Sequence, residues 1–100
     1  MRRKTQIREV MRNSMPFLPY LDFQRVFGKA RESHLKHLPV EVAVKLAATS
    51  YVRHTYTDYD RLLNEGYDRD AARYFTLYDT AEKLAEWGYR LDVETIINSG

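Results

Sequence analysis

Apolar side chains recur at intervals of three and four residues along most of this chain, and strand-like alternation is nearly absent. That spacing gathers apolar residues on one face of an α-helix. Prolines and glycines interrupt the pattern and keep each helix short. The 100 residues suffice for one domain with a modest core. We therefore expect an all-α fold, a compact bundle of about five short helices forming a single domain over residues 1–100.

Capping signals mark the ends of these helices. Asp22 can cap the second helix, Pro39 suits the first position of the third, and Gly66 suits the stop of the fourth. Asp92 can cap a last helical turn over residues 93–98. We expect the third helix to be the most buried element. The five helices are predicted over residues 4–13, 23–34, 39–54, 59–65 and 69–87.

The fifth helix is predicted to bury one wide stripe. Apolar residues with helical spacing form that stripe, and they are Ala72, Phe75, Tyr78, Ala81 and Ala85, widened by Leu77, Leu84 and Trp87. The same helical spacing separates the tyrosines into those expected in the core and those expected at the surface. Tyr51, Tyr74 and Tyr78 have core spacing, whereas Tyr56, Tyr59 and Tyr89 are expected at the surface.

Positive charge is concentrated in the first part of the chain. Residues 1–40 carry nine Lys/Arg and three Asp/Glu, a net charge of +6, and residues 41–100 carry seven and eleven, a net charge of −4. Such a split is typical of a basic region that meets a polyanion or an acidic partner. Attraction between the two halves within the fold, or across a homodimer, explains it equally well. Residues 1–38 are thus a basic helical part, and residues 39–100 the helical core.

Composition excludes several classes of protein. The chain has no cysteine, so disulfides, thiolate chemistry and cysteine zinc sites are ruled out. No apolar run approaches the roughly 18 residues that span a membrane. Charges interrupt the basic N-terminus every few residues, unlike a secretory signal. We expect a cytoplasmic protein that does not enter a membrane.

The stretch YVRHTYTDYD, residues 51–60, has a complete structural interpretation as a joint between two helices. Arg53 and His54 suit the negative end of the third helix. The Thr57 hydroxyl can accept from an amide at the start of the fourth helix, and Asp60 can reach back to the amide of Thr57. Thr57, Asp60 and Gly66 are therefore the predicted structural caps.

A reactive interpretation of the same stretch pairs His54 with Asp58 or Asp60 as a general base and its orienting group. It would make the chain a hydrolytic enzyme centred on Arg53, His54 and Asp58. The sequence offers no clear nucleophile, oxyanion hole or glycine-rich phosphate loop for it, and no spacing supports Thr57 as the nucleophile. We favour a protein without catalytic residues and without a cofactor.

Metal binding has little support in the sequence. His34 and His37 could share a helix face, and His54 with Asp58 could add to them. The spacing matches no standard ligand pattern. We therefore expect no metal site.

The run YVRHTYTDYDRLLNEGYDRDAARYF resembles a family of small helical domains of unknown function from bacterial and fungal hypothetical proteins. The family pattern is V-R-H-x-x-T-x-Y-D-x-L-L-x-x-G-x-x-R-x-x-A-R with a later tryptophan, and it covers about residues 40–88. Upstream, GKARESHLKH stands where the family has a glycine- and arginine-rich stretch. The resemblance implies a helical fold and no particular chemistry. The matching positions, here called the motif, are Val52, Arg53, His54, Thr57, Tyr59, Asp60, Leu62, Leu63, Gly66, Arg69, Ala72, Arg73 and Trp87.

A weaker likeness is to helix-turn-helix units. In LLNEGYDRDAARYF a glycine turn joins two helices, and the second carries Arg69 and Arg73. In DNA-binding units of this kind the second helix enters the major groove. Asp68, Asp70 and Asp79 nearby would repel phosphates.

These observations predict a small interaction protein that binds a macromolecular partner, most plausibly a protein or a nucleoprotein complex. A chain of this size suits a phage or mobile-element adaptor or inhibitor. The alternatives are a DNA- or RNA-binding protein that uses the basic N-terminal half, and the hydrolytic enzyme described above. The candidate binding residues are Arg2, Arg3, Lys4, Arg8, Arg12, Arg53, His54, Tyr56, Tyr59, Arg69 and Arg73.

Overall fold

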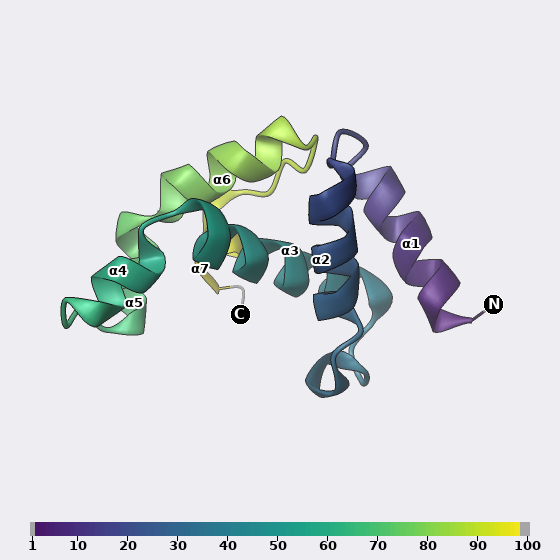
Figure 1. The fold of residues 1–100 in the computed structure, drawn as a ribbon, viewed down its shortest axis with the longest axis horizontal. Coiled ribbons are helices and arrows are strands. Elements are labelled where there is room, and N and C mark those ends of the chain that lie inside the picture. Colours follow the sequence, from purple (N-terminus) through teal and green to yellow (C-terminus); the bar gives the residue numbers. More distant parts are fainter. Residues whose placement is uncertain (1, 99–100) are drawn as a thin grey trace.

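Short helices follow one another through tight links along the whole of the described chain (Figure 1). The computed structural model describes residues 2–98, and every regular element in that range is helical, which confirms the all-α prediction. There are more helices here than the five we expected. They are α1 (Arg3–Ser14), α2 (Tyr20–Ala30), the 3₁₀ helix η1 (Ser33–Leu35), α3 (Val40–Tyr56), α4 (Tyr59–Asn64), α5 (Arg69–Phe75), α6 (Leu77–Glu86) and α7 (Val93–Asn98).

Helix α3 is the central element of the fold. Helices α1, α2 and α6 all pack against it. As predicted, it buries more residues than any other described helix. Three of these are alanines, Ala43, Ala47 and Ala48, whose small side chains let neighbouring helices approach closely. Figure 1 shows α1 and α2 at one end of the 44 Å long molecule and α4 and α5 at the other.

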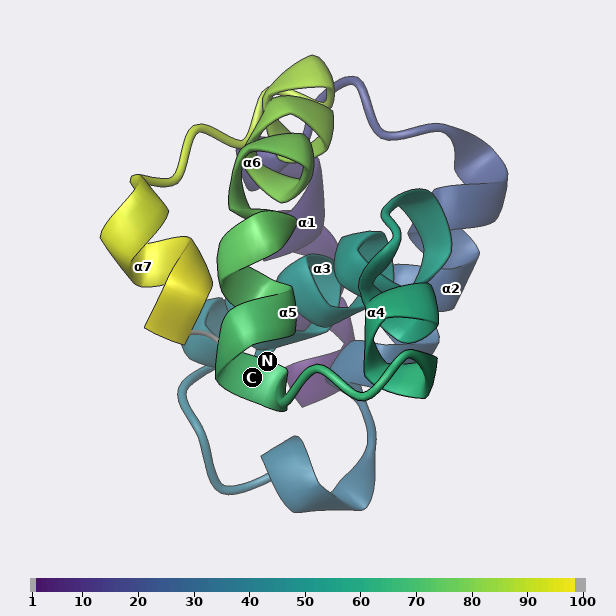
Figure 2. The ribbon, with the colours of Figure 1, turned by 90° about the vertical axis from the view of Figure 1, so that its left-hand side faces the viewer.

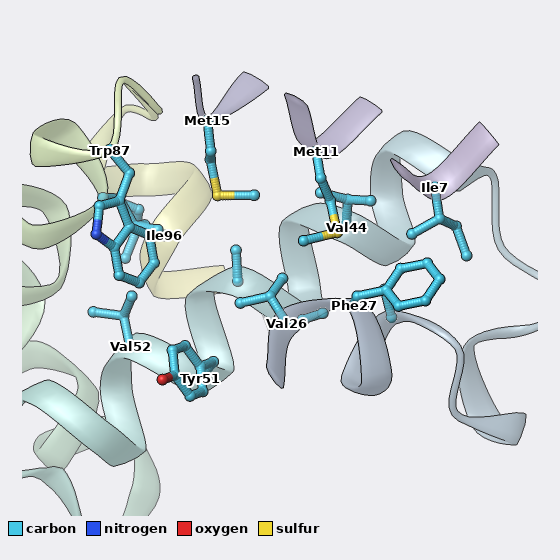
Figure 3. Close-up of a cluster of buried hydrophobic side chains, with 14 of the residues drawn as sticks. Ile7, Met11, Met15, Val26, Phe27, Val44, Tyr51, Val52, Trp87 and Ile96 are labelled. Atoms are coloured by element: carbon cyan, nitrogen blue, oxygen red, sulfur yellow. The ribbon is translucent and has the colours of Figure 1, made fainter. Parts of the chain in front are cut away.

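The hydrophobic core extends along α3 from the side of α1 and α2 to the side of α6 and α7. In Figure 3, Ile7 and Met11 of α1 and Met15, which follows it, lie above Val26 and Val44. Toward α6 and α7, the Trp87 ring stacks on the Tyr51 ring at 6.3 Å, beside Val52 and Ile96. One core therefore joins the basic N-terminal helices to the motif-bearing part of the chain.

The predicted fifth helix is two helices, and its predicted buried stripe is only partly right: Ala72, Leu77, Leu84 and Trp87 are buried, but Phe75 and Tyr78 are exposed. Thr76 separates α5 from α6 with φ −104° and ψ 8°. Its buried hydroxyl donates to the Ala72 carbonyl at 2.8 Å. The break resets the helical phase, so Leu77, Thr80 and Leu84 face inward on α6, whereas Tyr74, Phe75 and Tyr78 are 65%, 59% and 74% exposed.

Asp22 does not cap the second helix. Pro19 is the N-cap and α2 begins at Tyr20, so Asp22 lies inside the first turn with only 7% of its surface exposed. Its carboxylate accepts from the Tyr51 hydroxyl at 2.5 Å and from the Tyr56 hydroxyl at 2.6 Å. The helix also ends at Ala30, earlier than expected. The residue that was predicted to cap α2 therefore faces inward, and its carboxylate accepts two hydrogen bonds.

Two other predicted helix ends agree with the structure. Pro39 was expected to be the first residue of the third helix and is instead its N-cap, so α3 begins one residue later, at Val40. The Asp92 carboxylate accepts from the Thr95 amide at 2.7 Å, which confirms it as the cap of the last helix. None of the described helices is both long and apolar enough to cross a membrane.

Candidate functional site

The joint between α3 and α4 is organised by one hydroxyl. Thr57 donates to the Arg53 carbonyl at 2.5 Å and accepts from the Tyr59 amide at 3.2 Å. It thus satisfies a carbonyl at the end of α3 and an amide at the start of α4. Gly66 follows α4 with φ +102°, a conformation that glycine adopts without strain.

Replacing Thr57 by alanine should lower the free energy of unfolding by about 1 kcal/mol, because both of these backbone groups lose their side-chain partner. Chemical denaturation of the two proteins measures the difference. Thr55, which is exposed in the last turn of α3, provides the control. Thr55→Ala should change stability by less than about 0.5 kcal/mol. Equal effects of the two changes would contradict this role of Thr57.

His54 and Asp60 meet across the joint. His54 Nδ1 lies 2.6 Å from Asp60 Oδ1, so of the two acids considered for this histidine, Asp60 is the partner. Asp58 instead pairs with Arg61 at 3.1 Å. Asp60 therefore does not reach back to the Thr57 amide as expected. A carboxylate on Nδ1 fixes the imidazole ring and leaves Nε2 for another ligand. The Thr57 proton points to a backbone carbonyl, so this hydroxyl is not poised as a nucleophile.

Arg53 is a buried cation. Only 3% of its surface is exposed, and its guanidinium donates to the Ile96 carbonyl of α7 at 3.1 Å. The guanidinium also lies 5.5 Å from the centre of the Tyr59 ring. Burial lowers the pKa of Arg53, and the nearby charge of Arg73 lowers it further. An arginine nonetheless stays protonated at neutral pH, so the interior carries a fixed positive charge here.

Arg53 forms part of a small basic pocket, here called the arginine pocket. Figure 2 looks onto this end of the protein, where α4 and α5 lie in front of the end of α3. The pocket has a volume of about 170 Å³, and none of the residues that line it is acidic. Six of the lining residues are motif positions. They are Arg53, His54, Tyr59, Leu63, Arg69 and Arg73, and Ser50 completes the set.

Sequence reasoning missed Ser50 and misplaced Tyr59. Ser50 lies one helical turn before His54, which was the available signal. Tyr59 was expected at the surface but is only 4% exposed. The Arg53 guanidinium covers its ring, and the His54 ring meets it edge-on at 5.1 Å. Tyr56, by contrast, lies outside the pocket: it is 42% exposed and donates to Asp22.

The five predicted basic residues at the N-terminus do not act alike. Arg3 is structural, since its guanidinium donates to the carbonyls of Leu35 and Leu38 at 3.1 and 2.7 Å. Arg2 and Lys4 are exposed. Arg8 and Arg12 lie over aromatic rings of α2, Arg8 at 4.7 Å from the centre of Phe27 and Arg12 at 5.7 Å from Phe23.

Arg8 and Arg12 line a groove between the first two helices, here called the α1–α2 groove. Its volume is about 500 Å³, and its lining includes no acidic residue. The Phe23 and Phe27 rings stack at 6.3 Å, and Arg31 lies 4.9 Å from the centre of Phe27. Within residues 2–40, no Lys or Arg forms an ion pair. Sequence reasoning found the two arginines but missed the aromatic floor. The lining residues are Arg8, Arg12, Met15, Pro16, Leu18, Tyr20, Phe23, Gln24 and Phe27.

A third feature is an exposed aromatic patch formed by Tyr67, Tyr74 and Phe75, which lie on α5 and the link before it, and Tyr78 is also exposed at the start of α6. The rings of Tyr67 and Tyr74 each meet the Phe75 ring edge-on, at 5.5 and 5.9 Å. All four side chains are at least 46% exposed. Exposed aromatics gathered in this way are typical of interaction surfaces.

The histidines do not assemble a metal site in the described residues. No group of three or more His, Asp or Glu side chains in residues 2–98 is close enough to hold an ion. His34 lies in η1 and His37 in the turn after it, because α2 ends at Ala30. The helix face that the two were predicted to share is therefore absent.

The described residues form a small all-helical fold with an arginine-lined hollow at each end. The chain belongs to the family described as an uncharacterized conserved protein (DUF2293), whose model matches residues 10–88. This confirms the resemblance to a family of unknown function and extends it upstream, from α3 back into α1. Comparison with curated proteins found no match. Comparison with solved structures found none either.

Proposed function

We propose that this protein acts by binding rather than by catalysis, and that the α1–α2 groove takes a single-stranded nucleic acid. The observation that carries the proposal is the lining of the groove. Arg8 and Arg12 flank a stacked pair of phenylalanines, with no acid in the lining and no ion pair on either arginine. Phosphates suit the arginines, and an unpaired base suits the partly exposed Phe23 ring, which stacks on the buried Phe27 ring.

A single strand suits this groove better than a duplex. The aromatic rings lie between α1 and α2, where a base can stack only if it is not held in a paired helix. Tyr20, which is 78% exposed at the mouth of the groove, offers a further ring. The uncompensated charge of residues 2–40 adds attraction that does not depend on sequence. The partner is then DNA or RNA that is locally unpaired, alone or within a nucleoprotein complex.

Labelled single strands titrated against the protein at two salt concentrations test the proposal. Arg8→Ala combined with Arg12→Ala should weaken binding at least about tenfold and should flatten the dependence on salt, because two phosphate contacts are lost. The control is Arg61→Ala combined with Arg90→Ala. It makes the same change of charge at exposed positions outside the groove lining and should reduce affinity much less.

Three results would contradict nucleic-acid binding at this groove. One is the absence of binding at low salt. Another is equal loss of affinity in the two double variants, which would indicate a diffuse charge effect. A third is binding of an acidic peptide with no binding of nucleic acid, which would make the partner a protein. Thermal unfolding of each variant separates these outcomes from loss of the fold, since Arg8 also packs on Phe27.

A protein partner is the second candidate, favoured by the exposed aromatic patch. Tyrosine and phenylalanine are common anchors at protein interfaces. In this second proposal, the protein is an adaptor or inhibitor from a phage or mobile element, and its partner belongs to a cytoplasmic complex. Tyr74→Ser combined with Tyr78→Ser should abolish capture of that partner. Phe17→Ser, a change at another exposed ring, should leave capture intact. Light scattering tests whether the patch instead joins two copies of this chain.

A further inference from the structure

We infer that a groove beside the exposed aromatic patch binds an arginine side chain of a protein partner. The groove, here called the α4–α6 groove, has a volume of about 270 Å³, and its lining includes the Tyr67 and Phe75 rings and the charged groups of Asp58, Arg61 and Asp79. It lies at the end of the protein that holds α4 and α5 (Figure 1). The inference rests on the second candidate above, a protein partner at the aromatic patch, and it specifies the chemistry of that partner.

The two rings of the groove are open to solvent. Tyr67 and Phe75 are both exposed, and their rings meet at an angle of 77°, with centres 5.5 Å apart. Elsewhere the protein places its own cations over exposed rings, as where Lys83 lies 4.3 Å from the centre of Tyr56. Within residues 2–98, no Lys or Arg lies over the Tyr67 or the Phe75 ring. A cation from a partner would be attracted to the face of either ring.

The charged groups of the groove favour the same kind of ligand. Two carboxylates and one guanidinium line it, a net charge of −1. Arg61 is already offset, because it pairs with Asp58 at 3.1 Å and with Glu65 at 2.8 Å. Asp79 is exposed, and in the described part of the chain its carboxylate forms no ion pair or hydrogen bond. A partner cation can therefore pair with Asp79 without breaking an existing contact.

An arginine suits this combination better than a lysine. Its planar guanidinium can stack on an aromatic face and can donate in a fork to a carboxylate. A lysine ammonium is a compact and strongly hydrated charge. Sites for drug-sized molecules occupy about 300–1,000 Å³, so the groove, at about 270 Å³, takes one long side chain and leaves the rest of the partner outside. Leu62, also in the lining, offers an apolar contact to the stem of that side chain.

The charge around the groove favours a basic segment as the source of the arginine. Residues 41–100 carry a net charge of −4. Glu82, one helical turn beyond Asp79 on α6, is likewise exposed and forms no ion pair among the described residues. A negative surface of this kind attracts a positively charged segment before contact and speeds its association.

A second copy of this chain is a poorer source of arginine than its basic half suggests. Arg3 donates to two backbone carbonyls of its own chain. Arg8, Arg12 and Arg31 lie over phenylalanine rings of their own chain. The occupant is therefore an arginine-bearing segment of another protein.

Fluorescence anisotropy with a short labelled peptide of alternating arginine and serine tests the inference. The wild-type chain should bind it saturably, and the same peptide with neutral citrulline in place of arginine should not bind. Asp79→Asn should weaken binding about tenfold, because a charge-assisted pair of hydrogen bonds is lost. Phe75→Leu should weaken it about threefold or more, because leucine keeps an apolar surface but has no ring face for the cation.

Two matched variants control for overall charge and for loss of an exposed ring. Glu82→Gln removes the same charge from α6 at an exposed position outside the lining, and should leave affinity within about twofold. Phe17→Leu changes an exposed ring outside the groove and should leave affinity unchanged. Thermal unfolding of each variant separates a loss of binding from a loss of the fold.

The inference is overturned if the wild-type chain does not bind the arginine peptide at low salt or if the citrulline peptide binds equally well. It is also overturned if Asp79→Asn and Glu82→Gln weaken binding alike, which would indicate a diffuse charge effect. Self-association that Asp79→Asn abolishes, measured by light scattering, would overturn it by making a second copy the occupant.

Failure of this inference and failure of the proposed function give different results. Capture of a partner that is lost in Tyr74→Ser with Tyr78→Ser, but kept in Asp79→Asn, would retain the protein partner and overturn the arginine site. Arg8→Ala with Arg12→Ala should leave binding of the arginine peptide unchanged, because neither residue lines the α4–α6 groove. The nucleic-acid proposal can therefore fail without affecting this inference.

Discussion

Replacing Gly88 by alanine should lower the free energy of unfolding by about 2–4 kcal/mol, a large part of the stability of a domain this small. Gly88 ends α6 with φ +92°, a conformation that costs other residues about 1–3 kcal/mol. An added Cβ would lie 2.9 Å from Pro16 Cδ and 3.1 Å from Pro16 Cγ. The proline ring has little room to move, because the neighbouring Phe17 amide donates to the Trp87 carbonyl at 3.1 Å.

Two other glycines provide controls that separate backbone strain from crowding. Gly66 has φ +102° but no atom within 4 Å of an added Cβ, so Gly66→Ala should cost only the strain, about 1–2 kcal/mol. Gly28 is helical and open, and Gly28→Ala should stabilise the protein by about 0.5–1 kcal/mol. Chemical denaturation of the three variants gives the order. An equal cost at Gly88 and Gly66 would show that contact with Pro16 does not matter.

The helices were predictable because their signals are local. Apolar spacing within α3 and the glycine after α4 depend on residues close in sequence. The sequence predicted individual residues of the arginine pocket, but not that they come together. Arg53, His54, Arg69 and Arg73 were all candidates, but their meeting depends on two successive turns, before α4 and before α5. Small errors in either turn move Arg69 by many ångströms, so spacing alone could not place it beside Arg53.

The aromatic residues around the end of α5 and the start of α6 were assigned to the core because the break at Thr76 was not foreseen. Thr76 looks like an ordinary helical residue in the sequence, yet its hydroxyl bonds the Ala72 carbonyl and α5 ends there. Such a bond competes weakly with the helix, and the packing of α6 against α3 determines the outcome. Extending one helical phase through this break assigned Phe75 and Tyr78 to the core. The α1–α2 groove was missed for a similar reason, since it exists only where two separate helices meet.

The role of Asp22 was predicted incorrectly because a polar residue near the start of a helix has two possible structural roles. In the first turn of α2 it could cap the helix or face inward, and the sequence around it does not distinguish these. The hydroxyl groups that donate to its carboxylate, those of Tyr51 and Tyr56, lie 29 and 34 residues away on α3. The buried carboxylate therefore joins α2 to the end of α3 through two short hydrogen bonds.

Replacing Asp22 by alanine should lower the free energy of unfolding by about 2–4 kcal/mol at neutral pH, because two hydrogen bonds to a charged group are lost and the Tyr51 hydroxyl is left buried. Chemical denaturation measures this change. Asp79→Ala, at an exposed position in the first turn of α6, is the control and should change stability by less than about 1 kcal/mol. A cost at Asp22 no larger than that at Asp79 would contradict a structural role for the buried carboxylate.

The same cluster should make the protein sensitive to alkali. Burial, and then the hydrogen bond to Asp22, raise the pKa of Tyr51, and the hydrogen bond to Asp22 is the main cause of the raised pKa of Tyr56. Because both folded pKa values lie above the unfolded value of about 10, this stabilisation is complete below pH 10 and is lost as pH rises through the folded values. Denaturation between pH 9 and about 12 should therefore show falling stability, with a shallower fall in Asp22→Ala, while tyrosinate absorbance follows the titration. Identical pH profiles for the two proteins would mean that Asp22 does not hold these hydroxyls protonated.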